Sequence, residues 1–513
     1  MKQKQIFTII ALLLLSISIL FVYHFPDYYA WQNTPSGKSF SGQASWFDPW
    51  DINVYVAAIR WGQGHGLLLQ NTYTAQTHPS VLMYPVYTLT GFAFPQTSPQ
   101  LLFHLAAIIS GFILLVTLWF LCRIFLKARF ISLMATIAIA LGGGVGWLFF
   151  PNFQSSDLYI TGFTFASQFQ RPHEAFGIIF YLLSLVSFYL ATKEETRKWL
   201  VFSLISLGFL VIFYPYYLAS FAIIAGLYSL ILYFRDGEKK PFFNFLLIFT
   251  PAVIVFWAYF LSLKGNNGFS GVLSQNLTTP NIFQIISGYG VLTPLLIYQF
   301  IKKPKGEGVM FLNVWFITSI ILAFIPLGFA RFYLRGLFFP GIILSVFALD
   351  QISKTSKLPL KILIGLFLVL TSISSFFMFS ERIQEVKKDN HWFYLSIDEK
   401  NALDYLADKD NAGVLSGYTL GNYIPANTKA RVYFGHLLQT PHASEKIQNL
   451  AAFYSQKVST ESAKRFLDQA DITYIVWGEE EKQLGQNPQA KVLGYSFLKP
   501  VFQSKDLIIY SKD

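Results

Sequence analysis

The chain has 513 residues, of which 53% are hydrophobic and 13% charged, with a mean hydropathy of +0.44 and a net charge of +11. Soluble domains carry roughly 25% charged residues, so the composition excludes an ordinary water-soluble protein. The single cysteine, Cys122, excludes an intramolecular disulfide framework. Most basic residues of the apolar part lie in short loops, which indicates membrane orientation rather than nucleic-acid binding.

Eleven apolar runs are candidates for transmembrane helices, since a bilayer core of about 30 Å needs about 20 such residues. They are 6–23, 101–121, 130–150, 174–191, 199–214, 216–234, 243–263, 283–301, 309–327, 333–350 and 362–380. The motif Tyr214–Tyr217, "YPYY", predicts a hairpin between two runs, because Pro215 cannot donate to a helix ladder. A kink in one long helix is the alternative.

The distribution of basic residues predicts the orientation. With the N-terminus in the cytoplasm, 17 Lys and Arg fall in cytoplasmic segments and six in the outer segments before residue 381. The sequence therefore predicts a multi-pass α-helical protein of the cell membrane, with about 11 transmembrane helices. Its N-terminus is expected to be cytoplasmic and its C-terminal domain extracytoplasmic.

Two domains are expected. Residues 1–380 form the transmembrane domain, with a long first outer loop over 24–100, and residues 381–513 form an extracytoplasmic domain. The second segment holds 16 of the 39 basic and 17 of the 28 acidic residues. Apolar runs at 412–416, 430–435, 472–478 and 506–512 predict strands, and helical periodicity marks 398–408, 444–456 and 460–470. Strands that alternate with helices predict a small α/β domain.

The first outer loop contains "SWFDPWDINVYVAAIRWGQGHG", residues 45–66, with two carboxylates where acids are scarce. Apolar residues recur at helical spacing from Ile52 to Ile59, and Gly62 and Gly64 end the pattern. This predicts a short interfacial helix with Asp51 near its N-cap, where a carboxylate is favoured. One interpretation of Asp51 is therefore only a helix cap.

An acid followed by Tyr55, Arg60 and the "GHG" of residues 64–66, just after one apolar span, resembles the first outer loop of GT-C glycosyltransferases. Those membrane enzymes transfer a sugar from a polyprenyl-phosphate carrier. The run 72–91 also resembles the family's continuation toward the second span, and the run 421–436 resembles the C-terminal soluble outer domain of some bacterial members. The resemblance implies that Asp51, with Asp48 second, is the catalytic base or orients the acceptor hydroxyl.

A second polar group is "QFQRPHEAFG", residues 168–177, at a predicted membrane boundary. Ionisable residues there are costly unless they are paired or face water. Arg171 and His173 are candidates for binding the donor phosphate, and Glu174 for orienting them or binding the acceptor. The alternative is an internal salt bridge at a helix start, with Pro172 in the first turn.

A third group is "GFARFYLRG", residues 328–336. Arg331 and Arg335 are four residues apart, hence on one helical face if the helix extends this far. A guanidinium binds phosphate bidentately and stays charged when partly desolvated, so both are candidates for the donor phosphate. The alternative is contact with ordinary lipid phosphates.

Five further side chains are interpreted as acceptor-binding or structural polar groups: Glu174, Tyr55, Arg60, His65 and His78. No cofactor is assigned with certainty. A divalent metal ion at His65 and His78 is an alternative to hydrogen-bonded structure for these two residues.

The sequence thus predicts an integral membrane glycosyltransferase that moves a sugar from a polyprenyl-phosphate donor to an acceptor on the outer face, with inversion. The acceptor class (glycan, lipid or protein) and the sugar are left open. The alternatives are a lipid or glycan transporter or flippase, a polymerase or ligase of lipid-linked glycans, and an inactive scaffold. No internal repeat of the kind typical of transporters is visible.

Overall fold

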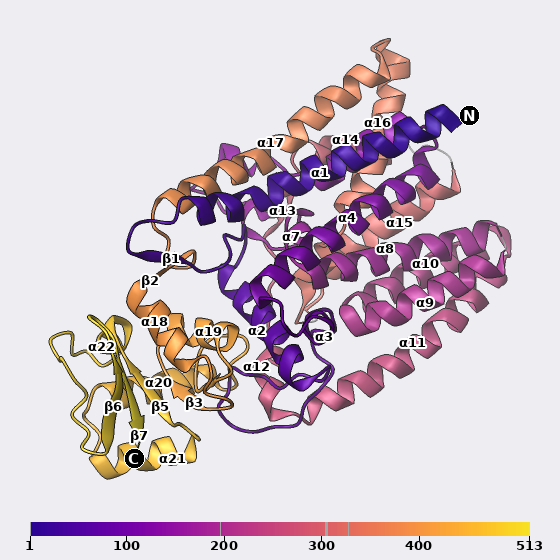
Figure 1. The fold of residues 1–513 in the computed structure, drawn as a ribbon. Helices are drawn as coiled ribbons and strands as arrows, with labels where there is room; N and C mark the ends of the chain where they lie inside the picture. Colours follow the sequence, from indigo (N-terminus) through magenta and orange to yellow (C-terminus); the bar gives the residue numbers. More distant parts are fainter. Residues whose placement is uncertain (1, 195, 303–305, 327, 513) are drawn as a thin grey trace. The chain divides into compact units, whose positions relative to one another are not determined.

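Figure 1 shows the computed structural model, which describes residues 2–194, 196–302, 306–326 and 328–512. The chain divides into two compact units. Unit 1 comprises Met1–Pro26, Leu105–Ala258 and Asn276–Gln384, and unit 2 comprises Asp27–His104, Tyr259–Gln275 and Glu385–Asp513. The predicted first outer loop therefore belongs with the C-terminal segment rather than with the apolar helices.

Unit 1 is helical, and each of the eleven predicted apolar runs contains helix. In the described part of the chain, seven helices are long and apolar enough to cross a membrane. They are α1 (Lys2–Gln32; span Thr8–Gln32), α4 (Pro99–Leu126), α8 (Pro172–Lys193), α10 (Tyr217–Asp236), α11 (Lys240–Lys264), α16 (Phe338–Ser356; span Ala330–Ser356, with the preceding 3₁₀ turn) and α17 (Leu360–Lys387). Shorter helices are α5 (Arg129–Ala140), α6 (Ser156–Tyr159), α7 (Ala166–Gln170), α9 (Arg197–Phe213), α13 (Ile282–Tyr289), α14 (Leu292–Lys302) and α15 (Glu307–Ala323), with 3₁₀ turns η1 (Gly146–Leu148) and η3 (Ala330–Leu334).

The break predicted at the Tyr-Pro-Tyr-Tyr motif is confirmed, because α9 ends at Phe213 and α10 begins at Tyr217. Two other runs differ from the prediction. The run 130–150 stops being helical at Ala140, and three glycines follow at 142–144. The run 283–301 is two helices, α13 and α14, which meet at 92°. Gly290 lies between them at φ +48°, where a Cβ would lie 2.8 Å from Gly144.

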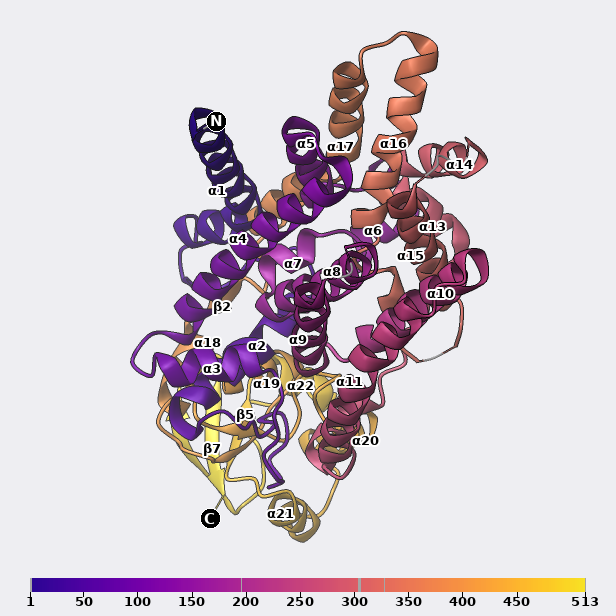
Figure 2. The same ribbon diagram turned by 90° about the vertical axis from the view of Figure 1, so that its right-hand side faces the viewer.

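The C-terminal part of unit 2 is a mixed sheet with helices on both faces. Its strand order is β4-β3-β5-β7-β6, with β3 parallel to β4 and β5, and β7 antiparallel to β5 and β6. The strands are β3 (Gly413–Leu415), β4 (Arg431–Val432), β5 (Tyr474–Trp477), β6 (Leu498–Gln503) and β7 (Ile508–Lys512). Figures 1 and 2 show β5 and β7 in yellow. The predicted α/β character of this segment is confirmed.

Alternation along the strands divides the core into two clusters. Leu415, Ile475 and Trp477 pack with α20 (Ala443–Tyr454) and α21 (Thr460–Gln469). Val414 and Val476 point the other way, as successive strand residues must. They join a cluster with α18 (Ile397–Leu406), α19 (Tyr418–Asn427) and residues of the first loop. The first loop and the C-terminal segment therefore share one hydrophobic core.

The remaining elements of unit 2 are short. Strand β1 (Lys38–Phe40) pairs antiparallel with β2 (Tyr394–Ser396). The other elements are α2 (Pro49–His65), α3 (Pro85–Ala93), η2 (Asn267–Phe269), α12 (Ser270–Leu273) and α22 (Glu479–Leu484). The β1–β2 pair joins the first loop to the start of the C-terminal segment through main-chain hydrogen bonds.

Candidate active site

The two acids of the first loop stand at the start of helix α2. Asp48 is the N-cap residue, and its carboxylate does not cap the helix. Pro49 occupies the first turn, and the Asp51 N–H donates to the Asp48 carbonyl at 3.0 Å. Asp51 therefore lies in the first turn rather than at the N-cap, where its negative charge is still favoured by the helix dipole.

Asp48 has a backbone conformation that few residues adopt. Its φ and ψ are 40° and 65°, in the left-handed region. This conformation costs an L-residue other than glycine about 1–2 kcal/mol, although Asp tolerates it better than most. Such strain persists only where the surrounding structure enforces it, and it gathers at functional sites.

Helix α2 is held against α3 by two glycines. A Cβ on Gly62 would lie 2.2 Å from the Thr88 carbonyl oxygen, and one on Gly91 would lie 1.9 Å from that of Ile59. Any larger side chain would force the helices apart. The sequence predicted that Gly62 and Gly64 end the helix, but α2 continues to His65. Gly62 is thus a packing residue within the helix.

The Asp51 carboxylate is hydrogen-bonded to a residue far away in the sequence. Its Oδ1 lies 2.8 Å from Nε2 of His436, which follows strand β4. The Leu438 N–H donates to Nδ1 of the same ring at 3.2 Å. Because Nδ1 accepts, Nε2 carries the proton and donates to Asp51. The side chain of Asp51 is 22% exposed and that of His436 is 3% exposed.

Aromatic and amide side chains surround this pair. The Tyr73 ring packs edge-on to His436 with centroids 6.1 Å apart. Burial raises the pKa of Tyr73, and the charge of Asp51 raises it further, so Tyr73 stays neutral beside the carboxylate. The Asn71 amide donates to the carbonyl oxygens of Gly268 and Gln439 at 2.6 and 2.7 Å. The Asn71 side chain thereby connects the three sequence segments of unit 2, Asp27–His104, Tyr259–Gln275 and Glu385–Asp513.

The other polar residues predicted in the loop have structural contacts. Tyr55 is buried and stacks on Tyr87 at 4.8 Å. Nε of Arg60 donates to the Ala426 carbonyl at 3.0 Å, and burial lowers the pKa of Arg60. These contacts join α2 to its neighbours in unit 2.

The two loop histidines have different surroundings. His65 stacks on Trp61 with ring centroids 4.0 Å apart. Nε2 of His78 lies 3.1 Å from the Asn71 N–H, and Nδ1 lies 3.0 Å from the Pro79 carbonyl oxygen. Among the described residues, the group of His, Cys, Asp and Glu side chains that could hold a metal ion is another one, His24, Asp27 and His104.

Unit 1 holds a buried ionic cluster at the start of helix α8. Glu174 lies 3.5 Å from Arg171 and 3.4 Å from Arg335, and all three side chains are at most 5% exposed. Oγ of Ser167 donates to Glu174 at 2.6 Å. The predicted internal salt bridge is therefore present. These three ionised groups carry one net positive charge, which is costly in a medium of low dielectric constant.

Arg335 is fixed from several sides. It donates to the Tyr214 hydroxyl and lies over the Phe332 ring at 4.2 Å. Gly162, at φ +80°, leaves room for the guanidinium, because a Cβ there would lie 2.4 Å from Nε. The predicted common helical face with Arg331 does not form, since η3 ends at Leu334 and Arg335 is extended. Arg331 is half-buried on η3.

His173 lies beside the cluster, with its ring centroid 6.0 Å from that of Tyr214. The structure thus brings Arg171, Glu174 and Arg335 together, with His173 nearby. Tyr214, which the sequence marked only as part of a hairpin, is a further member. Nothing in the local sequence pattern points to this role.

A second buried carboxylate of unit 1 has neutral partners. Asp157 accepts from the Gly144 N–H at 2.9 Å and from the Ser155 hydroxyl at 2.5 Å, and Ser374 also donates to it. Burial raises the pKa of Asp157. It connects the glycine turn after α5 to helix α17, and so has a structural role.

The solved structures that this chain resembles include two membrane glycosyltransferases. One is the oligosaccharyltransferase AglB of Archaeoglobus fulgidus, in complex with an inhibitory peptide and a dolichol-phosphate. It matches with a TM-score of 0.56 and 12% identity, over 91% of this chain and 70% of that one. ArnT of Cupriavidus metallidurans, in the apo state, matches with a TM-score of 0.53 and 11% identity, over 98% and 97%. The chain has the GT-C fold.

The GT-C fold confirms the predicted fold class, a polytopic helical protein with a small α/β segment at the C-terminal end. No protein-family model and no curated protein sequence matches the chain. Identities of 11–12% place the likeness to the GT-C enzymes at the level of the fold. Roles of individual residues therefore have to be argued from their own geometry.

Proposed function

We propose that this GT-C protein is a membrane glycosyltransferase that moves a sugar or glycan from a polyprenyl-phosphate donor to an acceptor on the outer face of the membrane. The observation that carries the proposal is the first-loop carboxylate of Asp51, partly exposed and held at 2.8 Å by His436, in a chain with this fold. The complex of AglB with a dolichol-phosphate supports a lipid-phosphate donor.

Asp51 is proposed as the base, with Asp48 as the second candidate. The Asp51 carboxylate takes or orients the proton of the acceptor nucleophile. The nucleophile then attacks the anomeric carbon as the bond from that carbon to the phosphate oxygen breaks. The electron pair leaves with the phosphate. A single displacement of this kind inverts the configuration and needs one carboxylate.

His436 is proposed as a positioning residue. As a neutral ring that donates from Nε2, it fixes one oxygen of Asp51 without adding a charge. A cationic partner would instead lower the basicity of the carboxylate.

The donor phosphate is proposed to lie near the cationic cluster of unit 1. Arg171 and Arg335 exceed Glu174 by one positive charge. An anionic leaving group would neutralise this excess, and cations stabilise the charge that develops on it. His173 and Arg331 are further candidates for the phosphate.

The test is sugar transfer by membranes that contain the overexpressed protein, with labelled polyprenyl-phosphate sugars as donors. We expect transfer by the wild type, a loss of at least 100-fold in Asp51→Asn, and wild-type rates in the control Asp404→Asn, whose carboxylate is 60% exposed. Loss in Asp48→Asn alone would move the base to Asp48.

A lipid or glycan transporter is the competing function. Translocation of lipid-linked glycans in proteoliposomes, without transfer from any donor, would contradict the proposal. A product that grows by repeated units from a second lipid-linked glycan would instead identify a polymerase of such glycans.

A further inference from the structure

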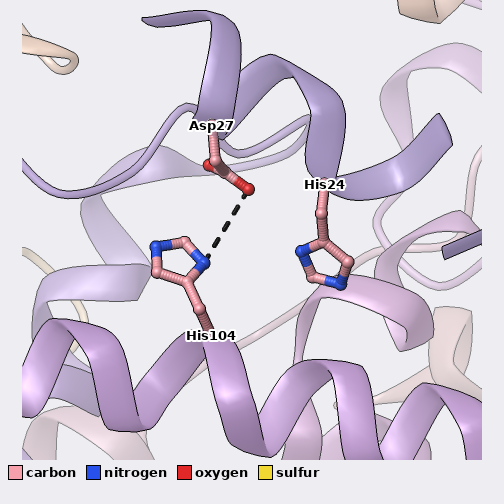
Figure 3. Close-up of side chains that lie close together, drawn as sticks. All are labelled: His24, Asp27 and His104. Carbon is pink, nitrogen blue, oxygen red and sulfur yellow. Dashed lines mark ion pairs between the residues drawn. The ribbon is translucent and has the colours of Figure 1, made fainter. Parts of the chain in front are cut away.

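Two residues of unit 2 flank the first loop and face each other. Asp27 lies near the end of α1, and His104 lies in the second turn of α4. Figure 3 shows the Asp27 carboxylate and the His104 ring pointing toward one another. Their side chains are 13% and 23% exposed. The loop that they enclose carries both candidate catalytic acids.

The hydrogen bonds of His104 define its tautomer. Nε2 lies 2.8 Å from the Gly42 carbonyl oxygen. A carbonyl only accepts, so Nε2 carries the proton and the lone pair of the neutral ring is on Nδ1. Nδ1 lies 3.9 Å from Oδ2 of Asp27. In the neutral ring, two acceptor atoms face each other at a distance too long for a hydrogen bond, and in the protonated ring the same two atoms form an ion pair.

This separation is slightly longer than that of two ligands of one cation. Two atoms bound to a tetrahedral zinc ion at about 2.0–2.1 Å lie roughly 3.3 Å apart, so the two side chains would approach each other by about 0.6 Å when they bind the ion. His24 is three residues before Asp27 on the continuous helix α1, so helical periodicity puts it on the face that carries Asp27 (Figure 3). Two imidazoles and one carboxylate form a common donor set for zinc.

A single short segment orients both facing ligands. The Ala44 N–H donates to Oδ1 of Asp27 at 2.6 Å, and the Gly42 carbonyl accepts from His104 at 2.8 Å. Metal-binding imidazoles usually donate their other N–H to a carbonyl or carboxylate in this way, and metal-binding carboxylates are themselves hydrogen-bonded. The residues from Gly42 to Ala44 thus supply the outer contacts that a metal site requires.

We propose that Asp27 and His104, with His24 from the preceding turn of α1, bind a divalent transition-metal ion of the zinc type. The ion joins the two ends of the first loop and so fixes the base of the segment that carries Asp48 and Asp51. The site does not depend on the proposed transfer activity. It also differs from the metal site predicted at His65 and His78.

The test is metal binding by the purified full chain in detergent. The protein is stripped with a chelator and titrated with Co²⁺, whose visible bands report tetrahedral coordination, and Zn²⁺ is then added as a competitor. We expect one ion per chain, displaced by Zn²⁺. Because no sugar donor is present, the result is independent of the proposed function.

Two variants remove a ligand and keep the neighbouring hydrogen bonds. In Asp27→Asn the amide oxygen still accepts from Ala44, and in His104→Gln the amide still donates to Gly42. We expect at least a 10- to 100-fold loss of Co²⁺ affinity in each, and unchanged affinity in the control His65→Ala. Unchanged affinity in both ligand variants, or loss in His65→Ala, would overturn the proposal.

X-ray absorption of the zinc-loaded wild type adds a measurement that needs no variant. Two imidazoles with one carboxylate are expected in the first shell. A spectrum with water oxygens only would overturn the proposal even if a variant fails to fold.

Discussion

One buried carboxylate from each unit, Glu174 of unit 1 and Glu481 of unit 2, is held in a different way. In unit 1, Glu174 lies between the guanidinium groups of Arg171 and Arg335. In unit 2, Glu481 accepts from the N–H groups of Gly417 and Gly478 at 2.6 and 2.9 Å. One carboxylate is stabilised by opposite charges and the other by backbone dipoles. The difference has consequences for charge: only the first arrangement leaves a cationic excess that an anionic ligand can neutralise.

The largest expected effect follows from removing the carboxylate of unit 1. Glu174→Gln leaves two buried guanidinium groups without their counter-ion, and we expect about 3–5 kcal/mol of lost stability. Thermal unfolding in detergent measures it. The control is Glu194→Gln, an exposed residue at the other end of α8.

A double variant sharpens this test. Glu174→Gln with Arg171→Gln returns the cluster to one excess positive charge and should recover part of the loss. Equal unfolding temperatures for Glu174→Gln and Glu194→Gln would contradict a stabilising role of Glu174 as the counter-ion of Arg171 and Arg335.

Glu481, the buried carboxylate of unit 2, should instead make the stability of the protein depend on pH. Burial, and next the neighbouring Glu480, raise the pKa of Glu481 to about 7 from its ordinary 4.5. The native carboxyl thus binds its proton more tightly than the unfolded one. The contribution of Glu481 to stability is therefore greatest below about pH 4.5 and falls by about 3 kcal/mol as the pH rises through 7.

Glu481→Gln removes this titration, so the stability of the variant should depend less on pH between 5 and 7. Unfolding temperatures across this range measure the slope. The exposed Glu479→Gln serves as the control and should keep the wild-type slope. A wild-type slope in Glu481→Gln would contradict the assignment.

The smallest expected effect concerns the neutral partner of Asp51. His436→Ala removes the Nε2 donor, and we expect kcat for transfer to fall about 10- to 100-fold with little change in KM. His436→Gln can still donate and should retain most of the activity. Equal losses in both variants would indicate packing rather than positioning of the carboxylate.

Much of the fold could be predicted from the sequence, because long apolar runs mark membrane helices, and short apolar runs that alternate with helical segments mark an α/β domain. Both patterns are local in the sequence. The helices of unit 1 other than α6 and α7 overlap predicted runs, and strands β3, β4, β5 and β7 fall within theirs. Helix α19 was missed because it contains Gly421 and Pro425, which favour turns. Strand β6 was missed because it is an exposed edge strand with Pro500.

The candidate site was predictable only in part. The sequence marks Asp48, Asp51, Arg171, Glu174 and Arg335 because ionisable residues are rare in its apolar part. It does not show which partners they meet. His436 is 385 residues from Asp51, and Tyr214, in the break between α9 and α10, is 121 residues from Arg335. A local sequence pattern cannot predict such contacts, because they join residues that are far apart in the sequence and depend on the tertiary fold.

The bridging amide of Asn71 has a consequence for synthesis. It donates hydrogen bonds to the carbonyl oxygens of Gly268 and Gln439. Asn71 is synthesised early, so these bonds form only after the ribosome has added the two later residues. Helix α2 and its acids are translated early but cannot reach their final environment before residues 436–439 exist. A ribosome that stops ahead of that point releases a product with its spanning helices but without the His436 contact. Completion of translation is thus a condition for assembling the site.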